Sequence, residues 1–283
     1  MAEVLANGLR FNVQTLRAPE SSAAGSPAGP RPQVVMLHGL VADNLSSWYY
    51  TIANPVAAAG ADVHLYDLRG HGRSEVPDDG YTVADNVADL AALLDAWGLD
   101  GPVHLFGNSF GCVVSLAFAH AHPERVASLF LVEAHFAVEG WGEHMAGSLA
   151  LAAFGLDEEG VQEWLDANAD RKLSRFAKRS EHLLTKTSLI DDLQREQPFP
   201  TAWLEEIACP TFALYGSESD ILDRARQLEA HVPGCELEIV EGTHSLLMEA
   251  SALVRERALA WMARHGAASV GAEAAAAPGP DLG

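Results

Sequence analysis

The chain has 283 residues, of which 48% are hydrophobic and 20% charged, a composition typical of a soluble globular protein. Its net charge of −21 argues against a nucleic acid or an anionic membrane as partner, because phosphate groups would be repelled. No apolar stretch approaches the roughly 20 residues that a membrane-spanning helix needs. The N-terminal residues lack a signal-peptide pattern, and the three cysteines (Cys112, Cys209 and Cys235) form neither a disulfide framework nor a metal-binding motif. We therefore expect a cytoplasmic location.

The first half of the chain predicts strands and helices in alternation. An Asn-Gly turn between apolar-alternating flanks predicts a hairpin over residues 4–18, and 19–32 reads as a flexible connection. Beyond it, short apolar runs typical of buried strands alternate with stretches of helical period. Pro55 is expected to bend or interrupt the first helix. The expected strands are 33–38, 61–68, 102–107 and 126–134, and the expected helices are 46–60, 81–97 and 110–121.

Residues 135–205 break this alternation, because they carry several helical runs and no strong strand signal. We expect them to form a helical cap between two sheet strands. Alternation then returns, with strands at 209–216 and 235–242 and helices at 222–231 and 246–263. Repeated strand–helix units predict an α/β fold with a mostly parallel, doubly wound sheet. Its core would comprise residues 1–134 and 206–265, and the small, Pro/Gly-ended stretch 266–283 is predicted to be disordered.

The sequence Gly107-Asn108-Ser109-Phe110-Gly111 fits a nucleophile turn of the form G-x-S-x-G. It lies between a predicted strand and a predicted helix, the context that this motif requires. The two glycines remove side chains that would collide in so sharp a turn. Ser109 is therefore the candidate nucleophile, while the neighbouring Cys112 is interpreted as a buried structural thiol.

A serine nucleophile needs a base and an orienting acid. Asp220 and His244 each follow a late strand, so all three groups would meet at the C-terminal edge of a parallel sheet. Asp220 is favoured as the acid. Glu133, at the end of an earlier strand, is the alternative, and Asp223 is interpreted as solvated.

Two backbone amides are expected to form an oxyanion hole. The amide of Leu40 follows the first core strand, and the amide of Phe110 follows the nucleophile. Asp67, Arg69 and His71, in the Gly-rich loop after the second core strand, are expected to brace that loop rather than touch substrate.

Over residues 30–265 the chain resembles the α/β-hydrolase superfamily. The resemblance rests on five motifs: His38-Gly39-Leu40, Asp67 to Ser74, the Ser109 turn, Gly216-x-x-Ser219-Asp220, and Gly242-Thr243-His244. It implies a Ser-His-Asp triad: a neutral imidazole takes the serine proton, and the acid fixes its tautomer.

Substrate preference is expected to lie in the cap and the loops. Trp48, Phe136, Trp141 and Trp164 are candidates for lining an apolar acyl pocket, although core packing is an alternative for each. Asn108 is similar to the residue before the nucleophile in hydrolases that cleave carbon–carbon bonds. The basic segment 170–180 is interpreted as a solvated helix face, with a carboxylate or phosphate contact by Arg171, Arg175 or Arg179 as the sharper hypothesis.

The sequence thus predicts a serine hydrolase acting on an ester or thioester through an acyl-enzyme. The partner would be a small acyl substrate, free or carrier-linked, and neither a metal nor an organic cofactor is implied. Carbon–carbon hydrolysis, acyl transfer or cyclisation, cofactor-free lyase chemistry and a non-catalytic receptor remain as alternatives. The sequence gives no oligomeric state.

Overall fold

A computed structural model of the chain describes residues 2–20, 31–157 and 171–266, with the side chains of 154–157 and 171–176 left out. Its centre is an eight-stranded sheet in the order β1-β2-β4-β3-β5-β6-β7-β8. Strand β2 runs antiparallel to β1 and β4, and every other neighbouring pair is parallel. The predicted α/β class with a mostly parallel sheet is confirmed. The strands are β1 (Ala2–Ala6), β2 (Leu9–Leu16), β3 (Gln33–Leu37), β4 (Asp62–Tyr66), β5 (Val103–Asn108), β6 (Val126–Val132), β7 (Thr211–Gly216) and β8 (Glu236–Val240).

The N-terminal hairpin turns at Asn7 and Gly8, which have φ angles of 46° and 76°. Asparagine and glycine adopt this left-handed region more readily than other residues, and a two-residue turn of this kind matches the twist of the flanking strands. Ala6 therefore pairs directly with Leu9, as the Asn-Gly signal predicts.

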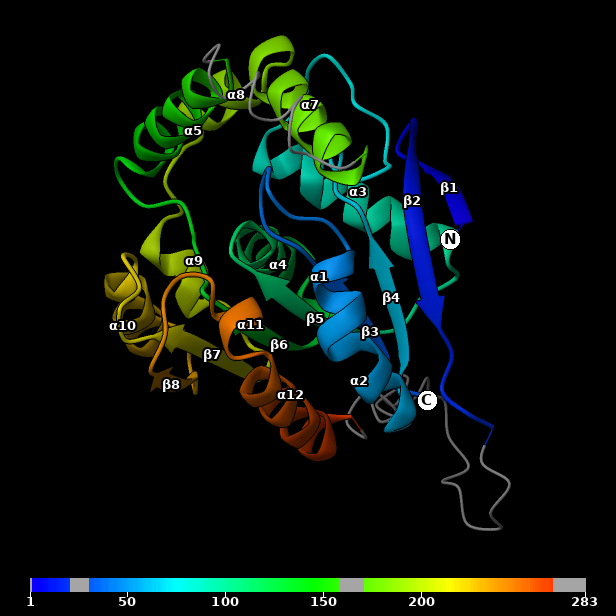
Figure 1. The fold of residues 1–283 in the computed structure, drawn as a ribbon. Helices are drawn as coiled ribbons and strands as arrows, with labels where there is room; N and C mark the ends of the chain where they lie inside the picture. The colour runs from blue at the N-terminus through cyan, green and yellow to red at the C-terminus, as the bar shows by residue number, and fades with distance from the viewer. Residues whose placement is uncertain (1, 21–30, 158–170, 267–283) are drawn as a thin grey trace, which may run out of the picture.

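Helices cover both faces of the sheet (Figure 1). Alternate residues of β3 divide between two buried clusters, so that Val35 and Leu37 face one layer and Val34 and Met36 the other. The first layer contains α3 (Val83–Ala96), α4 (Phe110–Ala121) and α10 (Leu222–His231). The second contains α1 (Ser46–Trp48), the π-helical turn η1 (Tyr49–Ala53), α2 (Asn54–Ala58), α11 (Leu246–Glu249) and α12 (Ser251–His265).

Two predicted helices differ in detail from the structure. Residues 46–58 form α1, η1 and α2 in direct succession, and Pro55 lies in the first turn of α2. Ala53 and Asn54, just before the proline, keep right-handed helical backbone angles, so Pro55 does not interrupt the run. The predicted helix 246–263 is instead two helices, α11 and α12, separated at Ala250.

Between β6 and β7 the described residues form helices and no strand. These helices are α5 (Trp141–Asp157), α7 (Arg171–Lys186), α8 (Leu189–Gln194) and α9 (Thr201–Glu205). A short 3-10 turn, η2 (Pro123–Arg125), precedes β6. Figure 1 shows α5, α7 and α8 together at the top of the molecule. Trp164 lies outside the described residues, as does all of the predicted tail except Gly266. Within the described ranges, no helix combines the length and apolar character needed to cross a membrane.

Candidate active site

Ser109 lies in the sharp turn between β5 and α4, with φ at 52°. A non-glycine residue in this region of backbone space is strained by about 1–3 kcal/mol, a strain that often marks functional sites. The flanking glycines make the turn possible. A Cβ atom on Gly107 would approach the backbone of Cys112 to 2.8 Å, and one on Gly111 would overlap the carbonyl group of Leu37.

A chain of hydrogen bonds joins Ser109, His244 and Glu133. The Nε2 atom of His244 is 3.0 Å from Oγ of Ser109, and its Nδ1 atom is 3.1 Å from Oε2 of Glu133. Because an ionised carboxylate only accepts hydrogen bonds, the imidazole proton belongs on Nδ1. The bare Nε2 then faces the serine hydroxyl as an acceptor, the arrangement that general-base activation of a serine requires.

Glu133 is enclosed on all sides, with a side chain that is 0% exposed. It follows β6 with φ at 52°. Its Oε1 atom accepts the N–H of Gly216 at 2.5 Å, and its Oε2 atom accepts the hydroxyl of Ser219 at 2.5 Å in addition to His244. Hydrogen bonds of this number compensate a buried carboxylate for lost hydration and fix its orientation.

The position that the sequence analysis gave to Asp220 is therefore occupied by Glu133. Strand β7 ends at Gly216, and the following turn closes with a hydrogen bond from the N–H of Ser219 to the Gly216 carbonyl. This turn directs Ser219 inward, where it is 8% exposed, and leaves the next residue, Asp220, on the surface. Asp223 is also exposed, in the first turn of α10, as expected. Glu133, the alternative, makes the contacts that were expected of Asp220.

The amides of Leu40 and Phe110 both lack a hydrogen-bond acceptor in the described part of the chain. On either side of Leu40 the amides are anchored: Gly39 donates to Oδ2 of Asp43 at 2.7 Å, and Val41 donates to Nε2 of His71 at 2.7 Å. Leu40 thus presents an unpaired donor within a fixed loop. Two unpaired amides of this kind, one of them at a helix N-terminus, could stabilise an oxyanion.

The loop between β4 and α3 carries a network of bracing contacts. Asp67 accepts hydrogen bonds from the amides of Leu45 and Arg73, both at 2.8 Å. Arg69 forms a buried bidentate ion pair with Asp89, with both N–O distances at 2.6 Å. These contacts are the structural role that the sequence analysis expected for Asp67 and Arg69.

The structure places the candidate acyl-pocket residues in different environments. Trp48 is fully buried, and its indole N–H donates to the Leu37 carbonyl at 2.9 Å, so it belongs to the core and not to a pocket. Phe136 is also a core residue, 2% exposed. Asn108 lies beside the nucleophile and donates through Nδ2 to the Asp43 carboxylate at 3.3 Å. The burial of Trp48 and Phe136 fits core packing, the alternative that the sequence analysis gave for each of them.

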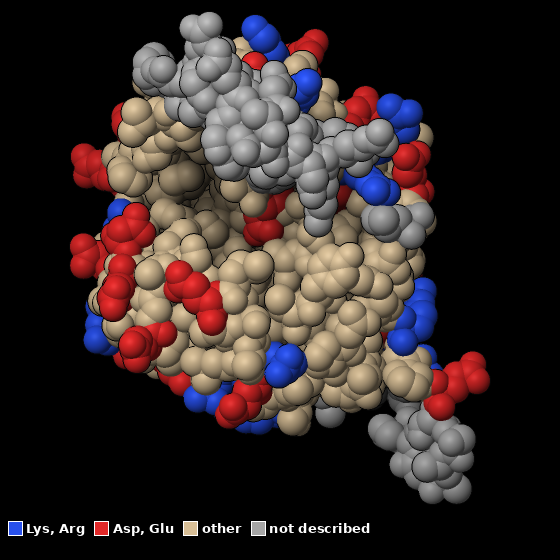
Figure 2. Space-filling view, in the orientation of Figure 1, with Lys and Arg blue, Asp and Glu red and all other residues tan. Residues whose placement is uncertain are grey.

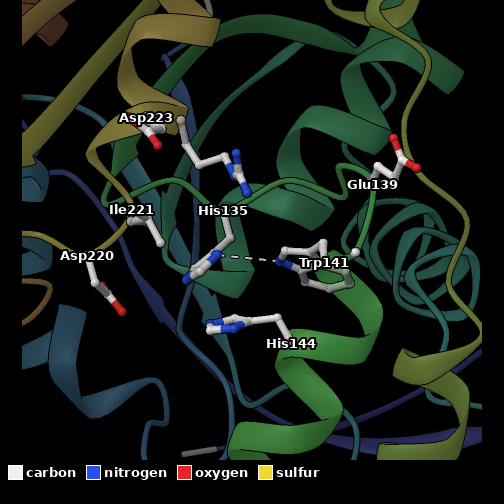
Figure 3. A pocket seen from close by; sticks show the side chains of 9 residues that line it. His135, Glu139, Trp141, His144, Asp220, Ile221 and Asp223 are labelled. Atoms are coloured by element: carbon white, nitrogen blue, oxygen red, sulfur yellow. Dashed lines mark hydrogen bonds between the residues drawn. The ribbon is translucent and has the colours of Figure 1, made fainter.

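A cavity of about 260 Å³ opens beside the catalytic histidine candidate, and Trp141 lines it (Figure 3). His135 lines this cavity and its ring packs against that of His244, with 5.1 Å between ring centroids. The indole N–H of Trp141 donates to Nδ1 of His135 at 3.4 Å. Burial, reinforced by the nearby His244, lowers the pKa of His135 to about 3. The other lining residues are Glu139, Gly140, His144, Asp220, Ile221, Asp223 and Arg224.

Sequence reasoning did not single out His135. Its only signal was its position two residues after Glu133, beyond the end of β6. Once Glu133 is the acid, the next inward-facing side chain of the same loop lies against His244.

The basic segment of the cap lies in α7. The side chains of Arg171 and Arg175 are outside the described residues, so their suggested anion contact stays a prediction. Arg179 donates to backbone carbonyl groups of the loop over residues 70–74 instead of a carboxylate.

The face of the molecule that Figure 2 shows has a hollow, with acidic side chains along its left side. Within the described ranges, no group of three His, Cys, Asp or Glu side chains is arranged to hold a metal ion.

Comparisons with known proteins agree with this architecture. A model of the alpha/beta hydrolase fold matches residues 32–251. Lipase LipV of Mycobacterium tuberculosis is 39% identical over 118 residues, which cover 40% of this chain and 41% of the lipase. A 2-hydroxy-6-oxononadienedioate/2-hydroxy-6-oxononatrienedioate hydrolase of Dechloromonas aromatica is 41% identical over 102 residues, 35% of each chain. The chain therefore aligns with less than half the length of these two relatives. A thermophilic esterase from Thermogutta terrifontis shares the fold, with a TM-score of 0.70 at 19% identity over 94% of this chain and 98% of the esterase.

Proposed function

Since the chain belongs to the alpha/beta hydrolase fold family, we propose that it is a serine hydrolase that cleaves an ester or thioester bond. The observation that carries the proposal is the hydrogen-bonded chain from Ser109 through His244 to Glu133, next to two unpaired amides. Its substrate is a small acyl compound, free or linked to a carrier. The acyl chain and the leaving group would be selected by the cap.

In the proposed reaction, Oγ of Ser109 attacks the acyl carbonyl carbon while Nε2 of His244 accepts the hydroxyl proton. The negative charge that develops on the carbonyl oxygen is stabilised by the amides of Leu40 and Phe110. Collapse of this intermediate breaks the bond to the alcohol or thiol, which leaves with the proton from His244. A water molecule then repeats the sequence on the acyl-enzyme and releases the acid.

Glu133 acts in this scheme through His244. Its carboxylate holds the Nδ1–H tautomer, so the lone pair of Nε2 faces the serine, and it stabilises the imidazolium that forms during attack. Since the carboxylate is buried and already accepts two further hydrogen bonds, its position is set before substrate binds. Pre-organisation of this kind lowers the reorganisation needed to reach the transition state.

Fluorophosphonate labelling tests the proposal directly. Wild-type protein should be labelled on Ser109, and Ser109→Ala should lose both the label and, by about 10⁴-fold or more, its turnover of acyl esters. Ser217→Ala is a matched control, because Ser217 is exposed and, among the residues that the structure describes, it forms a hydrogen bond only through its backbone N–H, to the Val240 carbonyl. A graded series of acyl esters and acyl thioesters then identifies the preferred chain and leaving group. Lack of labelling together with tight binding of an acyl ligand would point to a receptor.

Carbon–carbon hydrolysis is the second candidate. It is favoured by Asn108 before the nucleophile and by the 41% identity to the Dechloromonas enzyme, which is named as a hydrolase of 2-hydroxy-6-oxononadienedioate. The shared stretch covers only 35% of each chain, so most of the Dechloromonas enzyme lies outside the comparison. Turnover of a 2-hydroxy-6-oxo-dienoate in preference to every ester in the series would favour this activity.

A further inference from the structure

We propose that Arg179, on cap helix α7, positions the oxyanion loop of the core. The connection runs from its guanidinium group to the backbone of residues 70–74, and from His71 in that loop to the amide of Val41, beside Leu40. This inference rests on the proposed function, because it assigns the Leu40 amide to the oxyanion hole.

The guanidinium group of Arg179 donates hydrogen bonds to three backbone carbonyl groups of the loop. Its Nε atom donates to the Gly70 carbonyl at 3.3 Å, and its Nη2 atom donates to the carbonyl groups of His71, at 3.5 Å, and Ser74. Arg179 is half-buried, and no carboxylate in the described ranges forms an ion pair with it. A planar group with donors in a fixed fork can hold several carbonyl groups at once, which a single ammonium group cannot do in the same geometry.

Close packing between α7 and the loop accompanies these hydrogen bonds. Gly70 has φ at 78°, and a Cβ atom there would fall 2.6 Å from Cδ1 of Leu183, one turn further along α7. Glycine therefore allows the helix to lie directly on the loop. Just beyond α7, the amide of Ser188 donates to the Asp78 carbonyl at 2.9 Å. The C-terminal half of α7 and the residues just after it are thus fastened to the segment 70–78.

His71 transmits the position of this loop to the oxyanion loop. Its Nδ1 atom lies 2.7 Å from the carbonyl oxygen of Arg69, which only accepts hydrogen bonds, so the ring proton is on Nδ1. The bare Nε2 atom accepts the N–H of Val41 at 2.7 Å. Burial, with the nearby His38 and Arg179 adding to it, lowers the pKa of His71 to about 3, so this acceptor stays neutral.

The hydrogen bond from Val41 to His71 matters because Val41 has a strained backbone conformation. Its φ is 56°, a region that a β-branched residue rarely adopts and that costs about 1–3 kcal/mol. The bond to His71 holds Val41 in that conformation, and the peptide units on both sides of Leu40 depend on it. If the loop over 70–74 moves, Val41 can relax and the Leu40 amide turns away. The contacts among Ser109, His244 and Glu133 do not pass through this loop.

The test compares Arg179→Gln and Arg179→Lys with Lys178→Gln, an exposed neighbour on the same helix. We expect Arg179→Gln to lower kcat for a p-nitrophenyl acyl ester about tenfold with KM within about twofold, less than the loss of a whole oxyanion donor. The inhibition constant of a trifluoromethyl ketone of the same acyl chain should rise by the same factor. Arg179→Lys should not restore kcat, and Lys178→Gln should match wild type. Hydrogen exchange of residues 38–45 should accelerate in Arg179→Gln and Arg179→Lys but not in Lys178→Gln.

A second pair of variants leaves the cap contacts in place. His71→Asn keeps a donor at the Nδ1 position and removes the acceptor for Val41, whereas His71→Gln restores an acceptor near the Nε2 position. We expect the first to lose about as much kcat as Arg179→Gln and the second to recover most of it. This pair tests the link from His71 to Val41 directly, and Arg179→Lys tests the cap contact if Arg179→Gln does not fold.

The outcomes separate this inference from the proposed function. If wild-type protein neither labels nor turns over esters, the proposed function fails, and unchanged exchange of residues 38–45 in Arg179→Gln would remove the mechanical link as well. If wild type is active and Arg179→Gln resembles Lys178→Gln, the inference is overturned. It is also overturned if Arg179→Gln raises KM alone, since Arg179 would then bind substrate, or if His71→Asn keeps full kcat.

Discussion

The loops that follow β6 and β7 both carry a carboxylate at the C-terminal edge of the sheet, yet they treat it in opposite ways. Glu133, after β6, is fully buried and accepts hydrogen bonds from Gly216, Ser219 and His244. Asp220, after β7, is exposed and lines the cavity beyond His135. The β7 loop contributes to the site by enclosing the carboxylate of its neighbour. Position at the sheet edge is therefore insufficient to identify the acid, because enclosure by donors decides which carboxylate orients the histidine.

Neutralising the two carboxylates separately gives the largest predicted effect. We expect Glu133→Gln to lower kcat/KM for the preferred acyl ester by about 10³–10⁴-fold, because the amide can impose the wrong tautomer on His244. Asp220→Asn should change kcat/KM by less than about threefold, since exposed substitutions of this kind disturb little. Steady-state kinetics of both variants, with circular dichroism as a check on folding, make the comparison.

The same pair can contradict the assignment. If Asp220→Asn loses as much activity as Glu133→Gln, a loop rearrangement must bring Asp220 to His244 during turnover. Glu133→Asp adds a graded test: it keeps the charge but shortens the side chain, so we expect activity between that of wild type and Glu133→Gln.

The sequence predicted much of this fold, because periodicity and turn signals are local. The elbow at Ser109, the position of His244 and the unpaired amides next to them follow from glycine positions and strand ends. The choice between Glu133 and Asp220 is not local. It depends on a hydroxyl and an amide that arrive from the β7 loop, 83 to 86 residues further along the chain. The contact of Arg179 with the loop over 70–74 is likewise non-local, so the charge pattern suggested a solvated helix face, or an anion partner as the sharper hypothesis, and not this contact.

His135 lies in the buried loop after β6, two residues beyond Glu133, and its burial makes the stability of the protein depend on pH. Its pKa in the folded protein is about 3, below the usual value of 6.5, mainly because of burial. As pH falls below 6.5, the unfolded chain takes up a proton that the folded protein does not, so stability is lost. The loss attributable to His135 is about 2 kcal/mol between pH 7 and pH 5.

Urea unfolding of wild type and His135→Phe at both pH values measures this contribution. At pH 7 the variant loses the hydrogen bond from Trp141 and should be the less stable protein. At pH 5 the difference should shift in its favour by about 2 kcal/mol, since phenylalanine cannot take up a proton in either state. Other buried histidines are common to both proteins and cancel. A stability difference that is independent of pH would show that His135 is more accessible to protons than its packing indicates.

The smallest predicted effect concerns Ser219, whose hydroxyl is the side-chain donor that the β7 loop contributes to Glu133. Its Oγ atom donates at 2.5 Å to the oxygen that also accepts from His244. Hydrogen bonds to a charged group contribute about 1.5–3 kcal/mol, and only part of that bears on the orientation of the carboxylate, so we expect Ser219→Ala to lower kcat about tenfold. Ser219→Thr, which keeps the hydroxyl, should retain most of the activity, whereas Ser217→Ala on the exposed side of the same turn should retain all of it. Equal activity of Ser219→Ala and Ser217→Ala would mean that the amide of Gly216 alone suffices to orient Glu133, and the enclosing role of the β7 loop would reduce to its backbone.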